Sequence, residues 1–122
     1  MVALLYNTKS ESITVSATAG GSSGDVLYTC PTNHDCTLDI LLVSNGSNSS
    51  SKISIEFYHK DDDTYHNLTN DHSVAGHDTY NVFGSAQFHL HAGDKIVVHK
   101  ESGSTFDVTM SGREYYNPAR PS

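Results

Sequence analysis

The 122-residue chain contains no tryptophan, three prolines, two cysteines and only seven lysine and arginine residues. Fourteen Asp and Glu residues outnumber these cations, so the formal net charge is −7. A surface of that sign repels the phosphate backbone of DNA and RNA, and we expect no nucleic-acid partner. The absence of tryptophan also weakens any hypothesis of sugar binding by ring stacking.

Long apolar runs are absent as well. No stretch approaches the roughly 20 apolar residues that a bilayer-spanning helix needs. The first residues, "MVALLYNTKSES", lack both a basic leader and an apolar segment of signal-peptide length. We therefore expect no membrane partner and synthesis in the cytoplasm.

The two cysteines, Cys30 and Cys36, bracket the sequence "PTNHD". A cytoplasmic origin argues against a disulfide during folding, although their short separation would let a bridge close later. A zinc site that includes His34 lacks a fourth ligand and any recurring zinc-ligand spacing. A disulfide between Cys30 and Cys36 and a pair of inert thiols both remain open.

Apolar and polar residues alternate along much of the chain, as in "SKISIEFYHK" at 51–60. This period of two is typical of strands with one face on a core, and no helical period is sustained. Segments rich in Gly, Ser, Asn and Asp separate the runs and supply turns. The pattern predicts an all-β sandwich or barrel. The expected strands lie near residues 2–6, 11–17, 25–29, 36–44, 52–59, 64–68, 79–83, 86–91, 94–100 and 105–112.

Length predicts one domain, which we place at residues 1–112, with an N-terminal strand or arm at 1–10. The remaining segment, 113–122, contains two prolines, and prolines cannot donate to a central sheet ladder. We therefore expect residues 113–122 to form an extended C-terminal arm. Tyr and Arg in this arm are residue types enriched where proteins anchor to one another. An arm that lies on a neighbouring subunit and a frayed chain end both remain open.

A His-x-His pair, His89 and His91, precedes the turn Ala92–Asp94. Both imidazoles should share one face of a strand, and His99 could approach from the partner strand of a hairpin, which makes the three histidines candidate metal ligands. Cupins use such a pair, but their following carboxylate and later histidine motif are missing here. We interpret the stretch as a hairpin whose solvent-facing side chains are imidazoles, and we expect no cofactor and no catalytic residues.

Three segments in order resemble a family of small virion structural proteins of tailed bacteriophages: "VLYTCPTNHDCTLDILLVSN", "KISIEFYHKDDDTYHNL" and "LHAGDKIVVHKESGSTFDVTMSGRE". The resemblance implies an antiparallel β-sandwich of jelly-roll type with extended terminal arms. It also implies a virion protein made in the host cytoplasm. The implied function is a capsid decoration, or cement, protein that stabilises joints between shell subunits and is not an enzyme.

The partners implied by this resemblance are further copies of the chain, as a homotrimer, and the major capsid protein or other virion proteins. Alternatives are a tail-associated receptor- or carbohydrate-binding module, in which Tyr58, Tyr65, Tyr80 and His66 form an aromatic platform, and a cupin-like metal-dependent protein. The residues expected at the interface are Val2, Leu4, Leu5, Arg113, Tyr115, Tyr116 and Arg120.

Overall fold

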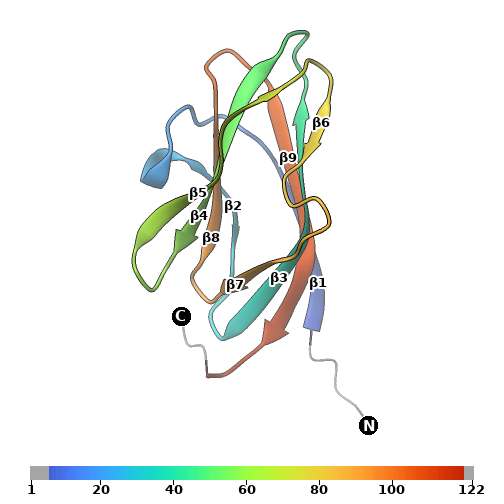
Figure 1. Ribbon diagram of the computed structural model, residues 1–122. Coiled ribbons are helices and arrows are strands. Elements are labelled where there is room, and N and C mark those ends of the chain that lie inside the picture. Colours follow the sequence, from blue (N-terminus) through green and yellow to red (C-terminus); the bar gives the residue numbers. More distant parts are fainter. Residues whose placement is uncertain (1–5, 120–122) are drawn as a thin grey trace.

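The computed structural model describes residues 6–119, which fold into two antiparallel sheets that face each other (Figure 1). A single short 3₁₀ turn, Gly21–Ser23, interrupts the strands of this part of the chain. The strands are β1 (Tyr6–Thr14), β2 (Asp25–Thr29), β3 (His34–Asn45), β4 (Ser51–His59), β5 (Thr64–Val74), β6 (Thr79–Asn81), β7 (Phe88–His91), β8 (Lys95–Lys100) and β9 (Phe106–Tyr116).

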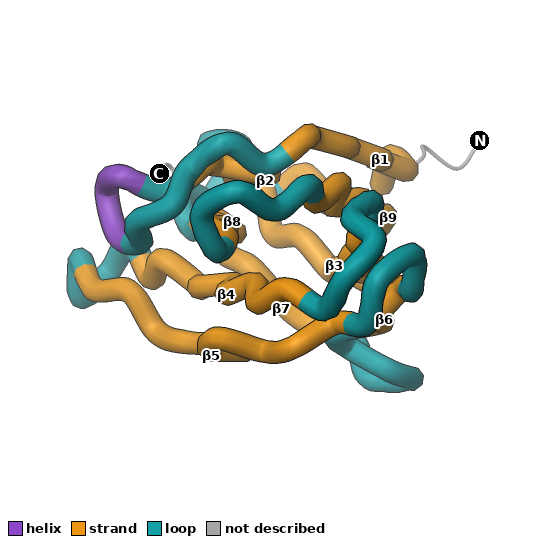
Figure 2. Tube along the Cα trace, turned by 90° about the horizontal axis from the view of Figure 1, so that it is seen from above, coloured by secondary structure: helices purple, strands orange, loops and turns teal. Residues whose placement is uncertain are grey.

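The strand order is that of a jelly roll. The first sheet runs β1-β9-β3-β6, with β7 also paired to β3, and the second runs β2-β8-β4-β5. The chain changes sheet at every connection except β4–β5 and β6–β7, so sequential strands face each other across the core. Figure 2 shows the two layers from above. The prediction of an all-β antiparallel sandwich is confirmed.

The core lies between the inner faces of the two sheets. Leu41 and Val108 from the first sheet and Ile55, Ile96 and Val98 from the second are fully buried. Each such side chain stabilises the fold by about 1.5–3 kcal/mol relative to an exposed one. Four of these positions belong to the alternating runs, namely Ile55, Ile96, Val98 and Val108, so the sequence pattern locates them. Leu41 departs from the pattern, because the register of β3 shifts between Leu38 and Ile40 and Ile40 is 42% exposed.

The centre of the first sheet depends on Gly112 in β9. A Cβ atom at this position would lie 2.3 Å from the carbonyl oxygen of Thr37, nearer than two such atoms can pack. The register of β3 against β9 shifts at the same place, between Leu38 and Ile40. Gly112 therefore lets the bulged part of β3 approach its neighbour.

The predicted C-terminal arm begins too early. Residues 113–116 belong to β9, which is paired with β1 on one side and with β3 on the other. The alternation continues through this segment, and the strand ends at Tyr116, two residues before Pro118. At the other terminus, residues 6–10 belong to β1, one continuous strand where two had been expected.

The expected hairpin around Gly93 is also wrong. β7 pairs with β3 in the first sheet, whereas β8 pairs with β2 and β4 in the second. The turn between them therefore carries the chain from one sheet to the other. No helix in residues 6–119 has the length and apolar character required to cross a bilayer.

Candidate functional site at the cysteine end of the sandwich

Two inter-sheet connections meet at the end of the sandwich where β3 begins. They are the β2–β3 loop, which starts at Cys30, and the β7–β8 turn at residues 92–94. The Cys30 amide donates to the Asp94 carbonyl oxygen at 2.9 Å, and the Gly93 amide donates to the Cys30 carbonyl oxygen at 2.9 Å. Gly93 adopts a φ of 88°, a conformation that favours glycine. This pair of hydrogen bonds holds the β2–β3 loop and the β7–β8 turn side by side.

Asp94 anchors the same end from inside the protein. Asp94 is 1% exposed. Its carboxylate accepts hydrogen bonds from the His91 amide at 2.8 Å and from the Lys60 amide at 2.9 Å. The His59 Nδ1 atom lies 3.4 Å from the same carboxylate. Asp94 therefore bonds a backbone amide close to it in sequence, and its bond to Lys60 links the β7–β8 turn to the β4–β5 turn.

The two thiols occupy adjacent positions in the core. Cys30 and Cys36 are 1% and 2% exposed, and both are free thiols that are not joined by a disulfide. The Cys30 sulfur lies 3.5 Å from the His34 carbonyl oxygen and 3.9 Å from that of Leu90, the cross-strand partner of Cys36. The interaction with Cys36 raises the pKa of Cys30, and burial adds to the rise. The interaction with Cys30 is the main reason why the pKa of Cys36 lies below its ordinary value.

Tyr28 and Glu114 complete this cluster. The Tyr28 hydroxyl lies 3.2 Å from the Cys36 sulfur and donates a hydrogen bond to the Glu114 carboxylate. Burial is the largest reason why the pKa of Tyr28 is raised, and the bonds to Cys36 and Glu114 add to it. Cys30, Cys36, Tyr28 and Glu114 are called the thiol cluster below. Alternation along β9 from Phe106 places Glu114 on the inward face, and this pattern is visible in the sequence.

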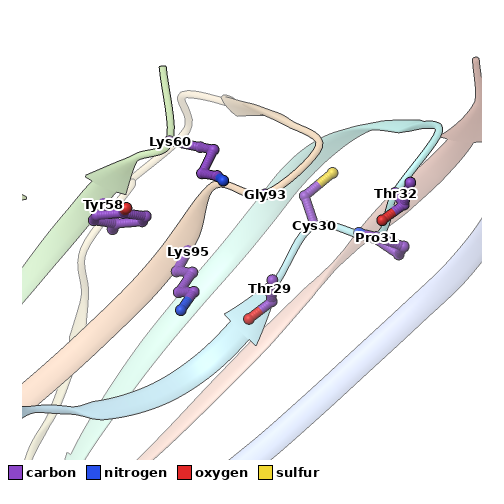
Figure 3. Close-up of a pocket in the computed structure, with 8 residues that line it drawn as sticks. All are labelled: Thr29, Cys30, Pro31, Thr32, Tyr58, Lys60, Gly93 and Lys95. Atoms are coloured by element: carbon purple, nitrogen blue, oxygen red, sulfur yellow. The ribbon is translucent and has the colours of Figure 1, made fainter. Parts of the chain in front are cut away.

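A cavity of about 390 Å³ opens beside the thiol cluster. Figure 3 shows its lining, with Thr29 and Cys30 at the end of β2 and Lys95 on β8. Lys60 and Lys95 bring two positive charges to this cavity, and the Lys95 ammonium lies 5.4 Å from the centre of the Tyr58 ring. The lining residues are Thr29, Cys30, Pro31, Thr32, Tyr58, Lys60, Gly93 and Lys95.

A second cavity, of about 350 Å³, lies between the edge strands β1 and β2. Its lining includes Tyr28 and Glu114 of the thiol cluster together with Lys9 and Glu11 of β1. Lys9 and Glu11 form an ion pair at 3.2 Å. The charges on the inward face of this edge strand are therefore compensated.

The histidines proposed as metal ligands are not brought together. His89 lies 3.0 Å from the Thr37 hydroxyl, and His91 lies 3.1 Å from the Asp35 carboxylate. His99 is in the other sheet, 3.7 Å from Glu56, because β7 and β8 do not form a hairpin. Among residues 6–119, no group of three His, Cys, Asp or Glu side chains could hold a metal ion.

The predicted interface residues that the structure describes belong to the end of β9. Arg113 bonds the Asp39 carboxylate at 3.2 Å, and Tyr115 packs on Tyr6 with ring centres 5.6 Å apart. Tyr116 is 65% exposed and lies beside His34. These three residues therefore belong to a paired strand and not to a free arm. Val2, Leu4, Leu5 and Arg120 lie outside the described residues.

The proposed aromatic platform is divided between the sheets. Tyr58 and Tyr65 are cross-strand neighbours in the second sheet, with ring centres 4.8 Å apart. Tyr80 lies in the first sheet and stacks on His72 at 3.9 Å, while His66 packs near Phe57 at 6.2 Å. These rings do not form one continuous surface.

No protein family and no curated protein sequence matches this chain. Its fold is similar to that of a chain in a solved structure of Bacillus endospore appendages, described as a novel family of disulfide-linked pili. The TM-score is 0.52 at 13% sequence identity, and the match covers 92% of this chain and 88% of the other. At this identity the likeness establishes a shared fold. The expectation of a phage capsid decoration protein is contradicted, because the matched chain belongs to a bacterial appendage and not to a capsid.

Proposed function

We propose that this protein is a structural subunit that assembles with further copies of itself through the free edge of β1. The observation that carries the proposal is the unbroken register of this strand. β1 pairs with β9 continuously from Tyr6, opposite Tyr115, to Thr14, opposite Asp107, and its other edge is unpaired in the described part of the chain. An edge strand of this kind is a template for pairing with a second chain.

The other edges of the two sheets are less suited to such pairing. β2 has five residues and a register shift between Val26 and Tyr28. The edge opposite β1 is divided between β6 and β7, which have three and four residues. β5 is long, but its register against β4 shifts twice. Bulges and short strands are the features by which proteins prevent unwanted edge pairing.

The cavity between β1 and β2 offers space for side chains of an added strand. A strand paired to β1 would direct alternate side chains inward, toward the gap that this cavity occupies. Lys9 and Glu11 neutralise each other there, so a polar side chain of a second copy meets no net charge from this pair. Inward charges normally protect an edge, and their pairing reduces this protection.

The likeness to a chain of Bacillus appendages supports assembly as a function. That protein is described as forming pili, and the shared fold extends over most of both chains. We assign this chain a role in assembly and not in catalysis. Its partners are copies of itself, and contact through one regular edge predicts pairs as the smallest assembly.

The test compares two double substitutions that change the charge equally. Ser10→Lys with Ser12→Lys places two cations on β1, at positions that face solvent and bond Ser111 and Thr109 of β9. Asn67→Lys with Asn70→Lys places two cations on exposed positions of β5. Like charges brought together on paired strands are destabilising.

Native mass spectrometry and sedimentation should find the unaltered protein and the β5 variant in the same assembly. The β1 variant should dissociate at least about tenfold more readily, which corresponds to about 1.4 kcal/mol. Circular dichroism checks that both variants retain their strands. Equal assembly of the two variants, or a monomeric unaltered protein, would contradict the proposal.

A further inference from the structure

The free edge of β1 presents a defined set of backbone groups. The Val15 amide donates to the Phe106 carbonyl oxygen at 2.8 Å, which continues the register of β1 against β9 by one residue. In an antiparallel pair, residues that exchange backbone hydrogen bonds alternate with residues that do not. Counting back from Val15, we find that Thr8, Ser10 and Ser12 direct their N–H and C=O groups away from β9 and toward the free edge.

The side chains of β1 carry a charge pattern on one face only. Lys9 and Glu11 are the charged residues of this strand, and both line the cavity between β1 and β2. Their side chains form an ion pair at 3.2 Å. A second strand that pairs with this edge therefore meets one positive and one negative position, two residues apart on the inward face.

Symmetry limits how two copies of this edge can pair. Antiparallel pairing of identical edges is described by a two-fold axis perpendicular to the sheet, so that one residue of β1 lies opposite its own copy. A pair centred on Lys9 would place two ammonium groups opposite each other, and a pair centred on Glu11 would place two carboxylates opposite each other. Like charges directly opposite on paired strands are destabilising.

Ser10 is the centre that satisfies both backbone and length. Its N–H and C=O groups point to the free edge, so Ser10 and its copy can exchange two hydrogen bonds. This centre pairs all nine residues of β1, because Tyr6 then lies opposite Thr14 of the other copy. Centres at Thr8 or Ser12 would shorten the paired segment and set each charged residue opposite an uncharged one.

We propose that two copies pair their β1 strands antiparallel about a two-fold axis at Ser10, with Lys9 of each copy opposite Glu11 of the other. The four charges then alternate in sign, both along each strand and across the interface. Two large apolar residues with exposed surface lie at this edge, Tyr6 on β1 and Val26 in the lining of the cavity. This inference rests on the proposed function and adds the orientation, the register and the contacts that select the partner.

The first test reverses the charges singly and then together. Lys9→Glu alone, or Glu11→Lys alone, places like charges opposite each other twice and should weaken the dimer about tenfold or more in sedimentation. Lys9→Glu with Glu11→Lys exchanges the charges, keeps the net charge at −7 and should restore the affinity of the unaltered protein. Single variants that pair normally, or a double variant as weak as the single ones, would overturn this register.

The second test places one thiol on the outward face of β1. Ser10→Cys lies opposite its own copy with Cα atoms about 5.5 Å apart, within the range that a disulfide spans. Ser12→Cys is the matched control, because it is equally exposed but lies about 13 Å along the strand from its copy. On mild oxidation, non-reducing electrophoresis should show a covalent dimer of the Ser10→Cys protein in several-fold higher yield. Equal yields, or no dimer from Ser10→Cys, would overturn the register.

These outcomes separate the register from the proposed function. If Ser10→Lys with Ser12→Lys dissociates the assembly while the charge and thiol tests fail, assembly through β1 stands and the two-fold pairing at Ser10 is wrong. A monomeric unaltered protein would overturn both.

Discussion

The edges formed by β1 and β5 are the two long edges of the sandwich, and they differ in regularity. β1 follows β9 without a shift over nine residues. β5 has eleven residues, but Asp71 adopts a φ of 47°, and the Ser54 hydroxyl accepts its amide at 2.8 Å inside a bulge. An edge that carries a bulge is poorly suited to extension, while a regular edge remains open to it. The difference shows that one fold can protect one edge and leave another available.

The largest effect is expected at Gly112 of β9, the strand with which β1 pairs. Gly112→Ala introduces a Cβ atom against the Thr37 carbonyl oxygen and should reduce the free energy of unfolding by about 3 kcal/mol. Urea denaturation measures this change. Gly46→Ala is the matched control, because a Cβ atom there meets no atom nearer than 3.4 Å, and it should change stability by less than about 1 kcal/mol. Equal losses would mean that Gly112 has no special role.

The next effect tests whether the bulge protects β5. Deleting Asp71 removes the residue that interrupts pairing opposite Ser54, so one of the two register shifts of β5 should disappear and the edge should become more regular. We expect association that increases with protein concentration, measured by light scattering. Asp71→Gly keeps the backbone conformation and should not associate more than the unaltered protein. If the deletion leaves the assembly unchanged, the bulge is not what distinguishes the two edges.

A smaller effect concerns the segment that follows β1. The Asp25 carboxylate accepts the Ser16 amide at 2.7 Å and the Ala17 amide at 3.0 Å, and these bonds lower the pKa of Asp25 below 3.8. A carboxyl group with a depressed pKa in the folded state stabilises the fold above its unfolded pKa, and this contribution is lost as the pH falls below about 4. Asp25→Asn should cost about 1 kcal/mol at pH 7.

The same substitution should have little effect near pH 2, where the native carboxyl group is also becoming protonated. Thermal unfolding at a series of pH values measures the difference between the two proteins. Stability curves that remain parallel from pH 7 to pH 2 would show that these hydrogen bonds do not depend on the charge of Asp25.

The smallest effect is expected at the β4–β5 turn, at the end of the protected edge. The Tyr58 hydroxyl donates to the Asp63 carboxylate, which raises the pKa of Tyr58 to about 12. Asp63→Asn should return one tyrosine to its ordinary value near 10. Ultraviolet absorbance between pH 9 and 13 follows this titration. Superimposable titration curves for the two proteins would show that the bond is absent in solution.

Local pattern was sufficient to predict most strands but not their partners. The run 25–29 was predicted with the bounds of β2, and the alternating run in β4 was predicted to within a residue. The assignment of an arm from residue 113 is wrong for residues 113–116, because the alternation continues through Glu114 and both prolines follow the end of the strand. The hairpin at Gly93 was misassigned because a tight turn looks the same whether it joins neighbours in one sheet or crosses to another.

The candidate site shows the same division. The sequence indicated that Cys30 and Cys36 could approach each other. It also placed His89 and His91 on one face, but it could not show that His99 belongs to the opposite sheet. Tyr28 and Glu114 are 86 positions apart, and no local signal connects them.

The amino-acid sequence alone determined that this protein is built of strands with one apolar face, since side-chain alternation is a local property of the extended backbone. Tertiary structure decided which strands are neighbours, which edges stay unpaired and which polar groups meet inside the sandwich. These outcomes depend on hydrogen bonds between distant segments. The backbone groups of one strand can form such bonds equally well with any other strand of matching length. Packing of the whole core selects among these pairings.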